Sequence, residues 1–416
     1  MVFCCTAYVY VAIWRLAAAA RVRCRTRVLA SVSSAPLLMS RAYPGCATRF
    51  PSRELPDRTP AIAVKRAPRI RSKGTVAASL TGNRKSNSKA CVARYGRVKS
   101  SCTICPEASK MAVEELPMAI TVCPVTPSFV AEIGDIDLSR PLEPADLVAI
   151  KDALTTYAVL IFPDQNLSQD QHLDFAKTFG PLETTIALFR KDTKLRVRKE
   201  FADVSNLDPD NAVWGENSRQ RLFQLGNRLW HTDSSFKRLP ARASLLYARS
   251  IPPIGGHTEF ADERAAYEAL PENMKRRLQG LVAEHSIFNS RARLGFTEFS
   301  DEERQGMPPV PQALVRTIPE SGRKSLYLAS HAGRIFGMPE PDGRALIDGL
   351  IAHATQRQFV YTHRWRVNDL VIWDNRCTMH RGSEFDDLRW KRDMQRATVS
   401  DVANTCEQEG ITVAVA

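Results

Sequence analysis

The sequence predicts a mainly β protein with covering helices, arranged as a jelly roll of the cupin-like kind. Many short apolar stretches separated by turn residues follow residue 119, a few segments have helical spacing, and no internal repeat is present. The chain has 416 residues, 44% hydrophobic and 25% charged, which is an ordinary globular composition. It is long enough for one large domain with extensions.

The first 110 residues differ from the rest of the chain in charge and in cysteine content. They hold 21 Lys and Arg against three acids, which leaves 37 of the 58 basic and 42 of the 45 acidic residues for the remainder. The remainder is mildly acidic and gives no reason to expect nucleic-acid binding. Only three of the ten cysteines, Cys123, Cys377 and Cys406, lie beyond this stretch, a number that suits a reducing compartment.

We therefore expect three parts: a basic, disordered leader over 1–117, a folded domain over 118–403 and a tail over 404–416. The Arg- and Ser-rich leader fits an organelle transit peptide, but we favour a disordered or non-native extension, because the segment cannot bury a core. Its apolar run is short and interrupted by Arg15, so we expect no membrane span. We expect a cytoplasmic protein, with organelle targeting left open.

The first half of the folded part alternates short strands and helices. Residues 168–180 suit a helix with Ser168 as its N-cap and Gly180 as its stop. Residues 184–226 are polar and irregular, and a loop of this length is usually functional, often a lid. The other expected elements are short strands within 120–139, a helix over 144–157 and a buried strand over 158–165.

The second half is richer in strands. Residues 262–281 suit a helix with short extensions, and 359–382 suit two strands joined at the turn pair Asn368-Asp369. The other expected elements are strands over 243–251 and 392–401, and a turn leading into a strand over 255–260.

The stretch LWHTDSSF, residues 229–236, contains a histidine and an acid two residues apart. On a strand, His231 and Asp233 would project from the same face. His380, in WDNRCTMHRG, is the candidate third ligand. Two histidines and one carboxylate on one face of a metal, with the other face open, are typical of non-haem Fe(II) oxygenases.

Two arginines strengthen this interpretation. Arg392 and Arg396 follow His380 by 12 and 16 residues in an alternating segment, so both point to one face of a strand. If that strand lies beside the one that ends at His380, both guanidinium groups reach the metal cavity. Arginine there offers a bidentate fork to a carboxylate.

With these motifs the chain resembles the taurine dioxygenase / 2,4-dichlorophenoxyacetate dioxygenase family of Fe(II)- and 2-oxoglutarate-dependent oxygenases. The resemblance covers roughly 119–402 and rests on GNRLWHTDSSF, GGHTEFADERAAYEAL, RKSLYLASHAGRI, VIWDNRCTMHR and KRDMQRATV. The third block and GFTEFSDEE resemble the herbicide-degrading branch more than the taurine branch. The resemblance implies a double-stranded β-helix core, and Fe(II), 2-oxoglutarate and O2 as metal, co-substrate and oxidant.

Residue by residue, the resemblance implies that His231, Asp233 and His380 bind iron. It implies that Thr258 and Arg392 hold the distal carboxylate of 2-oxoglutarate. Arg396 would bind the anionic group of the substrate, with Asn227 as a further substrate contact. Trp373 and Asp374 match the family pattern, and we interpret them as packing and turn residues.

The implied reaction is hydroxylation of a small anionic substrate, in the first place an aryloxyalkanoate such as 2,4-dichlorophenoxyacetate, which belongs to aromatic compound catabolism. Ether cleavage would give a phenol and an oxo-acid, with succinate and CO2. One alternative is the same chemistry on a sulfonate, a sulfate ester or a purine. Another is a metal-binding homologue without turnover. We also expect a homo-oligomer, a dimer or higher, and neither nucleic-acid nor membrane partners.

Overall fold

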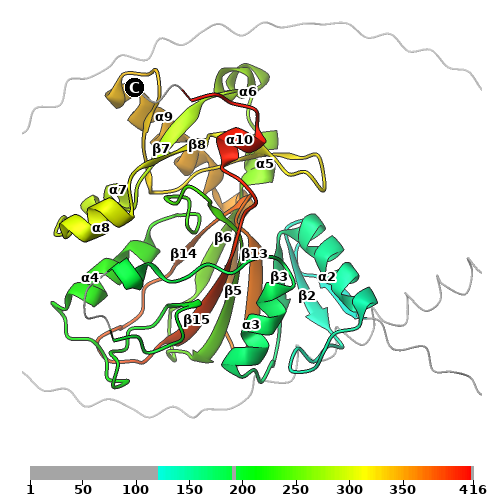
Figure 1. Cartoon of the computed structure of the whole chain (residues 1–416). Helices are drawn as coiled ribbons and strands as arrows, with labels where there is room; N and C mark the ends of the chain where they lie inside the picture. Colours follow the sequence, from blue (N-terminus) through cyan, green and yellow to red (C-terminus); the bar gives the residue numbers. More distant parts are fainter. Residues whose placement is uncertain (1–119, 190–193, 414–416) are drawn as a thin grey trace, which may run out of the picture. The chain divides into compact units, whose positions relative to one another are not determined.

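The computed structural model describes residues 120–189 and 194–413, and the predicted leader lies outside them (Figure 1). The mainly β class with covering helices is confirmed for these residues. In chain order the strands are β1 (Thr121–Pro124), β2 (Val130–Gly134), β3 (Val159–Phe162), β4 (Phe201–Asp203), β5 (Ala241–Ser250), β6 (Thr258–Asp262), β7 (Val282–His285), β8 (Val310–Ala313), β9 (Val315–Thr317), β10 (Lys324–Leu326), β11 (Ala332–Ile335), β12 (Val360–His363), β13 (Leu370–Asp374), β14 (Thr378–Gly382) and β15 (Asp393–Ser400).

Helices connect these strands and cover them. The α-helices are α2 (Pro144–Tyr157), α3 (Gln169–Lys177), α4 (Arg219–Gln224), α5 (Glu263–Glu268), α6 (Glu272–Leu278), α7 (Ile287–Ala292), α8 (Asp301–Gly306), α9 (Glu340–Ala354) and α10 (Thr405–Gln408). Short 3-10 helices are η1 (Ile186–Phe189), η2 (Leu225–Arg228) and η3 (Arg357–Phe359). No helix in the described ranges is long and apolar enough to cross a membrane.

A seven-stranded sheet in the order β1-β2-β3-β13-β5-β15-β4 forms the centre of the fold. Its strands pair antiparallel except for β2 and β3, which are parallel. Alternate side chains of each strand point to opposite faces of the sheet, and both faces are buried. On β13, Leu370 and Ile372 pack in the core that contains residues of α2 and α3, while Val371 and Trp373 pack in a second core with Phe260 of β6.

The two helices on the outer face begin and end where the sequence predicts, or close to it. Helix α2 spans the expected residues and begins with Pro144, whose missing N–H costs nothing at a helix start. Helix α3 has Ser168 as N-cap, in a reciprocal capping box with Gln171. It ends at Lys177, before the predicted stop.

The inner face of the central sheet is covered by a three-stranded sheet in the order β12-β6-β14. His380 of β14 lies opposite Phe260 of β6 in this sheet, and His363 of β12 lies opposite Thr258. The rings of Phe260 and Trp373 are in contact, with centroids 5.3 Å apart. Side chains that point inward from the two sheets therefore meet in the space between them.

Two predicted elements were wrong. Residues 359–382 form three strands instead of two, and the turn at Asn368 joins β12 to β13, which pair in different sheets. The predicted helix over 262–281 is two helices, because Pro271 supplies no N–H to continue the first and becomes the N-cap of the second.

The loop predicted over 184–226 contains more regular structure than expected. It includes η1, α4 and the short strand β4, which pairs with the edge of β15 and buries Phe201. Four residues within it, 190–193, lie outside the described part. The described part of this segment forms a layer beside β15.

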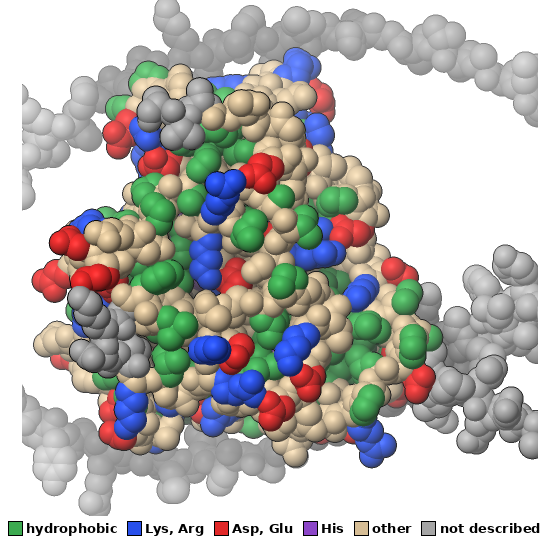
Figure 2. Space-filling model, viewed as in Figure 1, with side chains coloured by type: hydrophobic (Ala, Val, Ile, Leu, Met, Phe, Trp, Pro, Cys, Tyr) green, Lys and Arg blue, Asp and Glu red, His purple; other side chains and the backbone are tan. Residues whose placement is uncertain are grey.

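The remaining elements form a third core around α5 and α9, with strands of the sheets β11-β7-β8 and β10-β9. The segment expected to be a tail, from residue 404 onward, contacts this part: the Thr405 hydroxyl donates to Gln312, and Cys406 packs with Val282. Figure 2 shows acidic, basic and hydrophobic side chains interspersed over the face drawn.

Candidate metal centre and adjoining cavities

The HxD segment is not a strand, so the shared strand face considered from the sequence does not apply. His231 forms an isolated β-bridge with His380, in which each backbone N–H donates to the other's carbonyl at 3.0 and 2.8 Å. The chain then turns at Ser234, whose φ is +50°. Pairing with β14 fixes His231, and the turn brings the Asp233 side chain back toward it.

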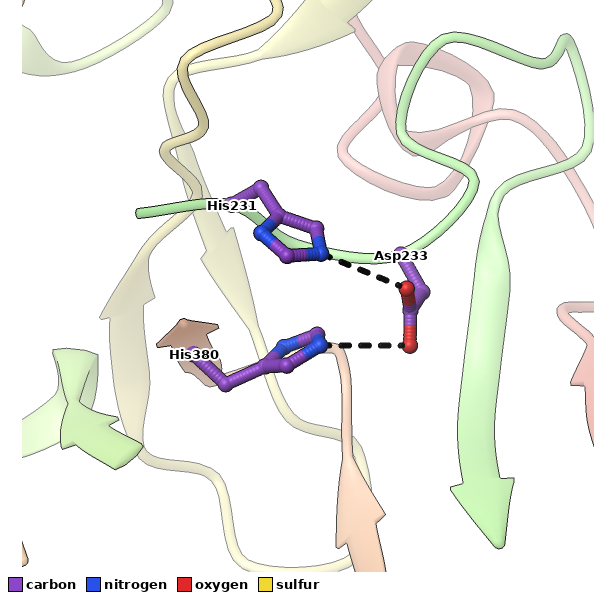
Figure 3. A group of neighbouring side chains, drawn as sticks. All are labelled: His231, Asp233 and His380. Atoms are coloured by element: carbon purple, nitrogen blue, oxygen red, sulfur yellow. Dashed lines mark ion pairs between the residues drawn. The ribbon is translucent and has the colours of Figure 1, made fainter. Parts of the chain in front are cut away.

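The three predicted ligands nevertheless converge, as Figure 3 shows. His231 Nε2 lies 3.7 Å from Asp233 Oδ1, and His380 Nε2 lies 3.7 Å from Asp233 Oδ2. One ligand atom from each residue lies within 4.8 Å of the others, and all three side chains are buried. Two imidazole nitrogens and a carboxylate in this arrangement suit a divalent transition metal.

The protonation of the site also fits a metal. The Nδ1–H of His231 donates to the Leu229 carbonyl at 2.7 Å, which leaves the Nε2 lone pair facing Asp233. Burial lowers the pKa of His231 and lowers that of His380 well below its ordinary value, so both rings are neutral near pH 7. Neutral imidazole is the form that binds metals.

Asp233 is held as a carboxylate by several donors. Burial by itself would raise its pKa, but Arg396, the two imidazoles and the Ser244 hydroxyl together lower it. Arg396 Nη1 contacts Oδ1, and Ser244 Oγ donates to Oδ2 at 2.7 Å. Ser244 was not among the predicted site residues, since a lone serine in a strand carries no sequence signal.

Arg392 is a buried cation whose guanidinium donates to two backbone carbonyls, of Gly256 at 3.2 Å and Val204 at 3.5 Å. Within the described residues no carboxylate forms an ion pair with it, and burial lowers its pKa to about 10. A buried guanidinium of this kind calls for an anion. The small dicarboxylate 2-oxoglutarate meets that requirement.

Thr258 presents a donor to the same space. Its Oγ accepts the indole N–H of Trp365 at 2.9 Å, so its own hydroxyl hydrogen is directed elsewhere. Thr258 and Arg392 line one cavity together with His380. From the sequence we considered that the strand after Arg392 lies beside the strand that ends at His380. In the structure that strand, β15, lies between β5 and β4 in the central sheet, while β14 with His380 lies in the other sheet.

Arg396 and Asn227 lie where two cavities meet. A small cavity of about 100 Å³ contains Arg392 and Thr258, and a larger one of about 970 Å³ contains Asp233. Both cavities are lined by His231, Arg396 and Asn227. Asn227 donates to the side chain of Gln224 at 3.2 Å.

The larger cavity has a mixed lining. Phe223, Phe236, Ile287 and Phe299 supply apolar surface, and Arg396 supplies positive charge beside Asp233. His331, which sequence reasoning did not single out, also lines it, with its ring centroid 5.9 Å from that of His231. Acidic and basic side chains line the rest of this cavity, so the apolar residues and Arg396 form one part of the wall that can contact an anionic molecule with an apolar body.

Comparison with known proteins agrees with this geometry. The family profile described as "Taurine catabolism dioxygenase TauD, TfdA family" matches residues 121–398. An alpha-ketoglutarate-dependent 2,4-dichlorophenoxyacetate dioxygenase of Cupriavidus pinatubonensis is 45% identical over 286 residues, 69% of this chain and 99% of the relative. An (S)-phenoxypropionate/alpha-ketoglutarate-dioxygenase of Sphingobium herbicidovorans is 35% identical over 290 residues, 68% of this chain and 95% of the relative.

A solved structure supports the same relation. The crystal structure of AAD-2 in complex with Mn(II) and N-oxalylglycine has a TM-score of 0.64 and 47% identity, and the match covers 69% of this chain and 99% of that chain. The resemblance predicted from the motifs is therefore confirmed, and the chain belongs to the TauD, TfdA family of dioxygenases.

Proposed function

We propose that this dioxygenase uses Fe(II), 2-oxoglutarate and O2 to hydroxylate an aryloxyalkanoate such as 2,4-dichlorophenoxyacetate. The observation that carries the proposal is the junction of two cavities at one buried His-Asp-His group, the smaller with an uncompensated arginine and the larger with an apolar wall. The named substrates of the relatives at 45% and 35% identity point to the same substrate class.

In this proposal His231, Asp233 and His380 hold the iron. Iron and 2-oxoglutarate together would supply the oxidising power that inserts one oxygen atom of O2 into a substrate C–H bond, giving succinate and CO2. The protein's part is to keep both imidazoles neutral and the carboxylate ionised, which burial and the donors around Asp233 support. It also restricts water, since all three side chains are buried.

The small cavity is proposed to hold 2-oxoglutarate. Arg392 would pair with its distal carboxylate, and the Thr258 hydroxyl would donate to the same group. The hydrogen bonds from the Arg392 guanidinium to the Gly256 and Val204 carbonyls use only part of its five N–H groups, which leaves donors for a bidentate pair. An anion there would offset the cost of burying the guanidinium.

The larger cavity is proposed to hold the substrate. Arg396 would bind its carboxylate, with Asn227 as a second polar contact, and the aromatic walls would contain the ring. Fixing the anion sets which C–H bond lies nearest the metal. Hydroxylation of the carbon beside the ether oxygen gives a hemiacetal, which collapses to a phenol and an oxo-acid.

The topology of the core, the bounds of the catalytic domain, the cellular location and the oligomeric state are part of the same proposal. We propose that the facing sheets form a double-stranded β-helix, that residues 118–403 are the catalytic domain, and that the enzyme is a cytoplasmic homo-oligomer without nucleic-acid or membrane partners. The burial of the site between two sheets supports the first point. The match of the family profile to 121–398 is compatible with the second.

One experiment tests the function directly. Fe(II) and 2-oxoglutarate are added to the purified chain without oxygen, and the visible charge-transfer band is recorded. Aryloxyacetates, phenoxypropionates, alkyl sulfates, taurine and a purine are then compared by succinate release in air. Phenol and succinate in equal amounts from aryloxyacetates support the proposal. Turnover of sulfates, sulfonates or purines only would replace the substrate, and no turnover of any compound would favour the non-catalytic alternative.

A further inference from the structure

We infer that Ser244 and Asn375 are positioning residues that hold the Asp233 carboxylate in a single orientation for metal binding. This inference rests on the proposed function, in which Asp233 is a metal ligand. Neither residue belongs to the His-Asp-His group, and neither lines the two cavities described above. Ser244 therefore acts on the metal through Asp233, and Asn375 acts through Asp233 and also through Trp373, whose ring centroid lies 4.6 Å from that of His380.

A continuous chain of hydrogen bonds connects these side chains. The indole N–H of Trp373 donates to Asn375 Oδ1 at 2.9 Å, and the backbone N–H of Asp233 donates to the same oxygen at 3.2 Å. Asn375 Nδ2 donates to Ser244 Oγ at 2.9 Å, and Ser244 Oγ donates to Asp233 Oδ2 at 2.7 Å. Asn375 thus holds the backbone of Asp233 while Ser244 holds its side chain.

The direction of every hydrogen in this chain is determined. An indole N–H and a backbone N–H can only donate, so the Asn375 atom that receives both must be its oxygen. The amide nitrogen then faces Ser244 and occupies a lone pair of the hydroxyl. The Ser244 hydroxyl must therefore direct its single hydrogen at Asp233, which keeps a donor on Oδ2.

The supports come from a rigid part of the fold. Ser244 lies on β5 directly opposite Trp373 of β13 in the central sheet, and Asn375 follows the end of β13. Ser244 and Asn375 are fully buried, with 0% of their surface exposed. Water from the surface cannot replace either bond, so the sheet fixes a ligand that itself lies in a turn.

Arg396 explains why a second donor is needed. It contacts Asp233 Oδ1, the other carboxylate oxygen, and it is also the residue proposed to bind the substrate anion. When Arg396 turns toward a substrate, Ser244 remains as the donor that holds the carboxylate. The orientation of Asp233 is then independent of whether the substrate is bound.

The test measures Mn(II) affinity, with free Mn(II) recorded by its EPR signal, and needs no turnover. Wild-type chain and Asp233→Ala establish that the metal binds at this site. Ser244→Ala is compared with Ser325→Ala, which also removes a fully buried serine hydroxyl, one that donates to a backbone carbonyl. We expect Ser244→Ala to weaken the Mn(II) Kd about 10- to 100-fold, as loss of ligand-supporting contacts does elsewhere. Ser325→Ala should bind like the wild type.

Two further measurements separate positioning from general structure. Ser244→Thr, which keeps the hydroxyl, should bind Mn(II) more tightly than Ser244→Ala. The KM for 2-oxoglutarate should stay at the wild-type value in Ser244→Ala, because Arg392 and Thr258 are untouched. If Ser244→Ala does not fold, Ser244→Cys replaces it, since a thiol is only a weak donor.

The outcomes distinguish this inference from the function on which it rests. Loss of Mn(II) binding in Asp233→Ala together with a wild-type Kd in Ser244→Ala, or in Ser244→Cys where it replaces that variant, overturns the positioning role and leaves the proposed function standing. Equal weakening in Ser244→Ala and Ser325→Ala overturns it as well. A wild-type chain that binds no Mn(II) would remove both proposals.

Discussion

Replacing Arg392 by methionine should leave the folded protein intact and remove its affinity for 2-oxoglutarate. Burial lowers the pKa of Arg392 from its ordinary value to about 10, which costs the charged form about 3 kcal/mol. The substitution removes that cost and also removes two hydrogen bonds to carbonyls, worth about 1 kcal/mol each. The free energy of unfolding without ligand should therefore stay within about 1 kcal/mol of the wild type or rise slightly.

The substitution should weaken the binding of 2-oxoglutarate strongly, although it leaves the stability almost unchanged. A dicarboxylate bound beside methionine keeps its charge and loses its buried partner, which costs about 3 to 5 kcal/mol. The KM for 2-oxoglutarate should rise at least about 100-fold. Arg392→Lys keeps the charge and loses the planar fork, so its KM for 2-oxoglutarate should lie between those of the wild type and Arg392→Met.

Unfolding in urea measures the free energy of unfolding, and initial-rate kinetics measure the KM for 2-oxoglutarate. The further rise in melting temperature that 2-oxoglutarate gives the Mn(II)-loaded wild type should be absent in the Arg392→Met variant, while the rise due to Mn(II) alone should remain. Arg334→Met is the matched control, because Arg334 is exposed and paired with Glu284. An unchanged KM for 2-oxoglutarate in Arg392→Met would refute the reasoning, whatever its stability.

Three more predictions concern charge and packing. Arg396→Ala should raise the KM for the anionic substrate and leave that for 2-oxoglutarate unchanged; equal increases in steady-state assays would argue against separate anion sites. Burial lowers the pKa of His285 from 6.5 to about 3, so stability present above pH 6.5 is lost as the pH falls toward 3. His285→Phe should thus reduce by about 2 kcal/mol the stability lost between about pH 7 and pH 5 in urea titrations, and an unchanged loss would contradict this. Gly226→Ala would place Cβ 2.2 Å from Cζ of Arg291, whose buried guanidinium lies over the Phe223 ring and has to leave it to make room, so it should destabilise the fold by about 1 to 3 kcal/mol; a wild-type unfolding curve would show that this guanidinium moves at no cost.

Local signals predicted the helices better than they predicted strand partners. The capping box at Ser168 and the proline start of α2 act over a few residues, so the sequence indicates both. The turn at Asn368 was also found, but a turn does not say whether its flanking strands pair. Here β12 pairs with β6 and β13 pairs with β3 and β5, in different sheets.

The sequence by itself determined the reaction class and which side chains to look for. His231, Asp233, His380, Arg392 and Arg396 stand in motifs whose types and spacing suit a metal and two anions. Only the tertiary structure decided how they meet, with His380 on one sheet and Arg396 on the other. It also supplied the support for Asp233, through bonds that join residues 11 and 131 positions apart. Contacts between distant residues depend on sheet register, and register is set by burial of the whole fold.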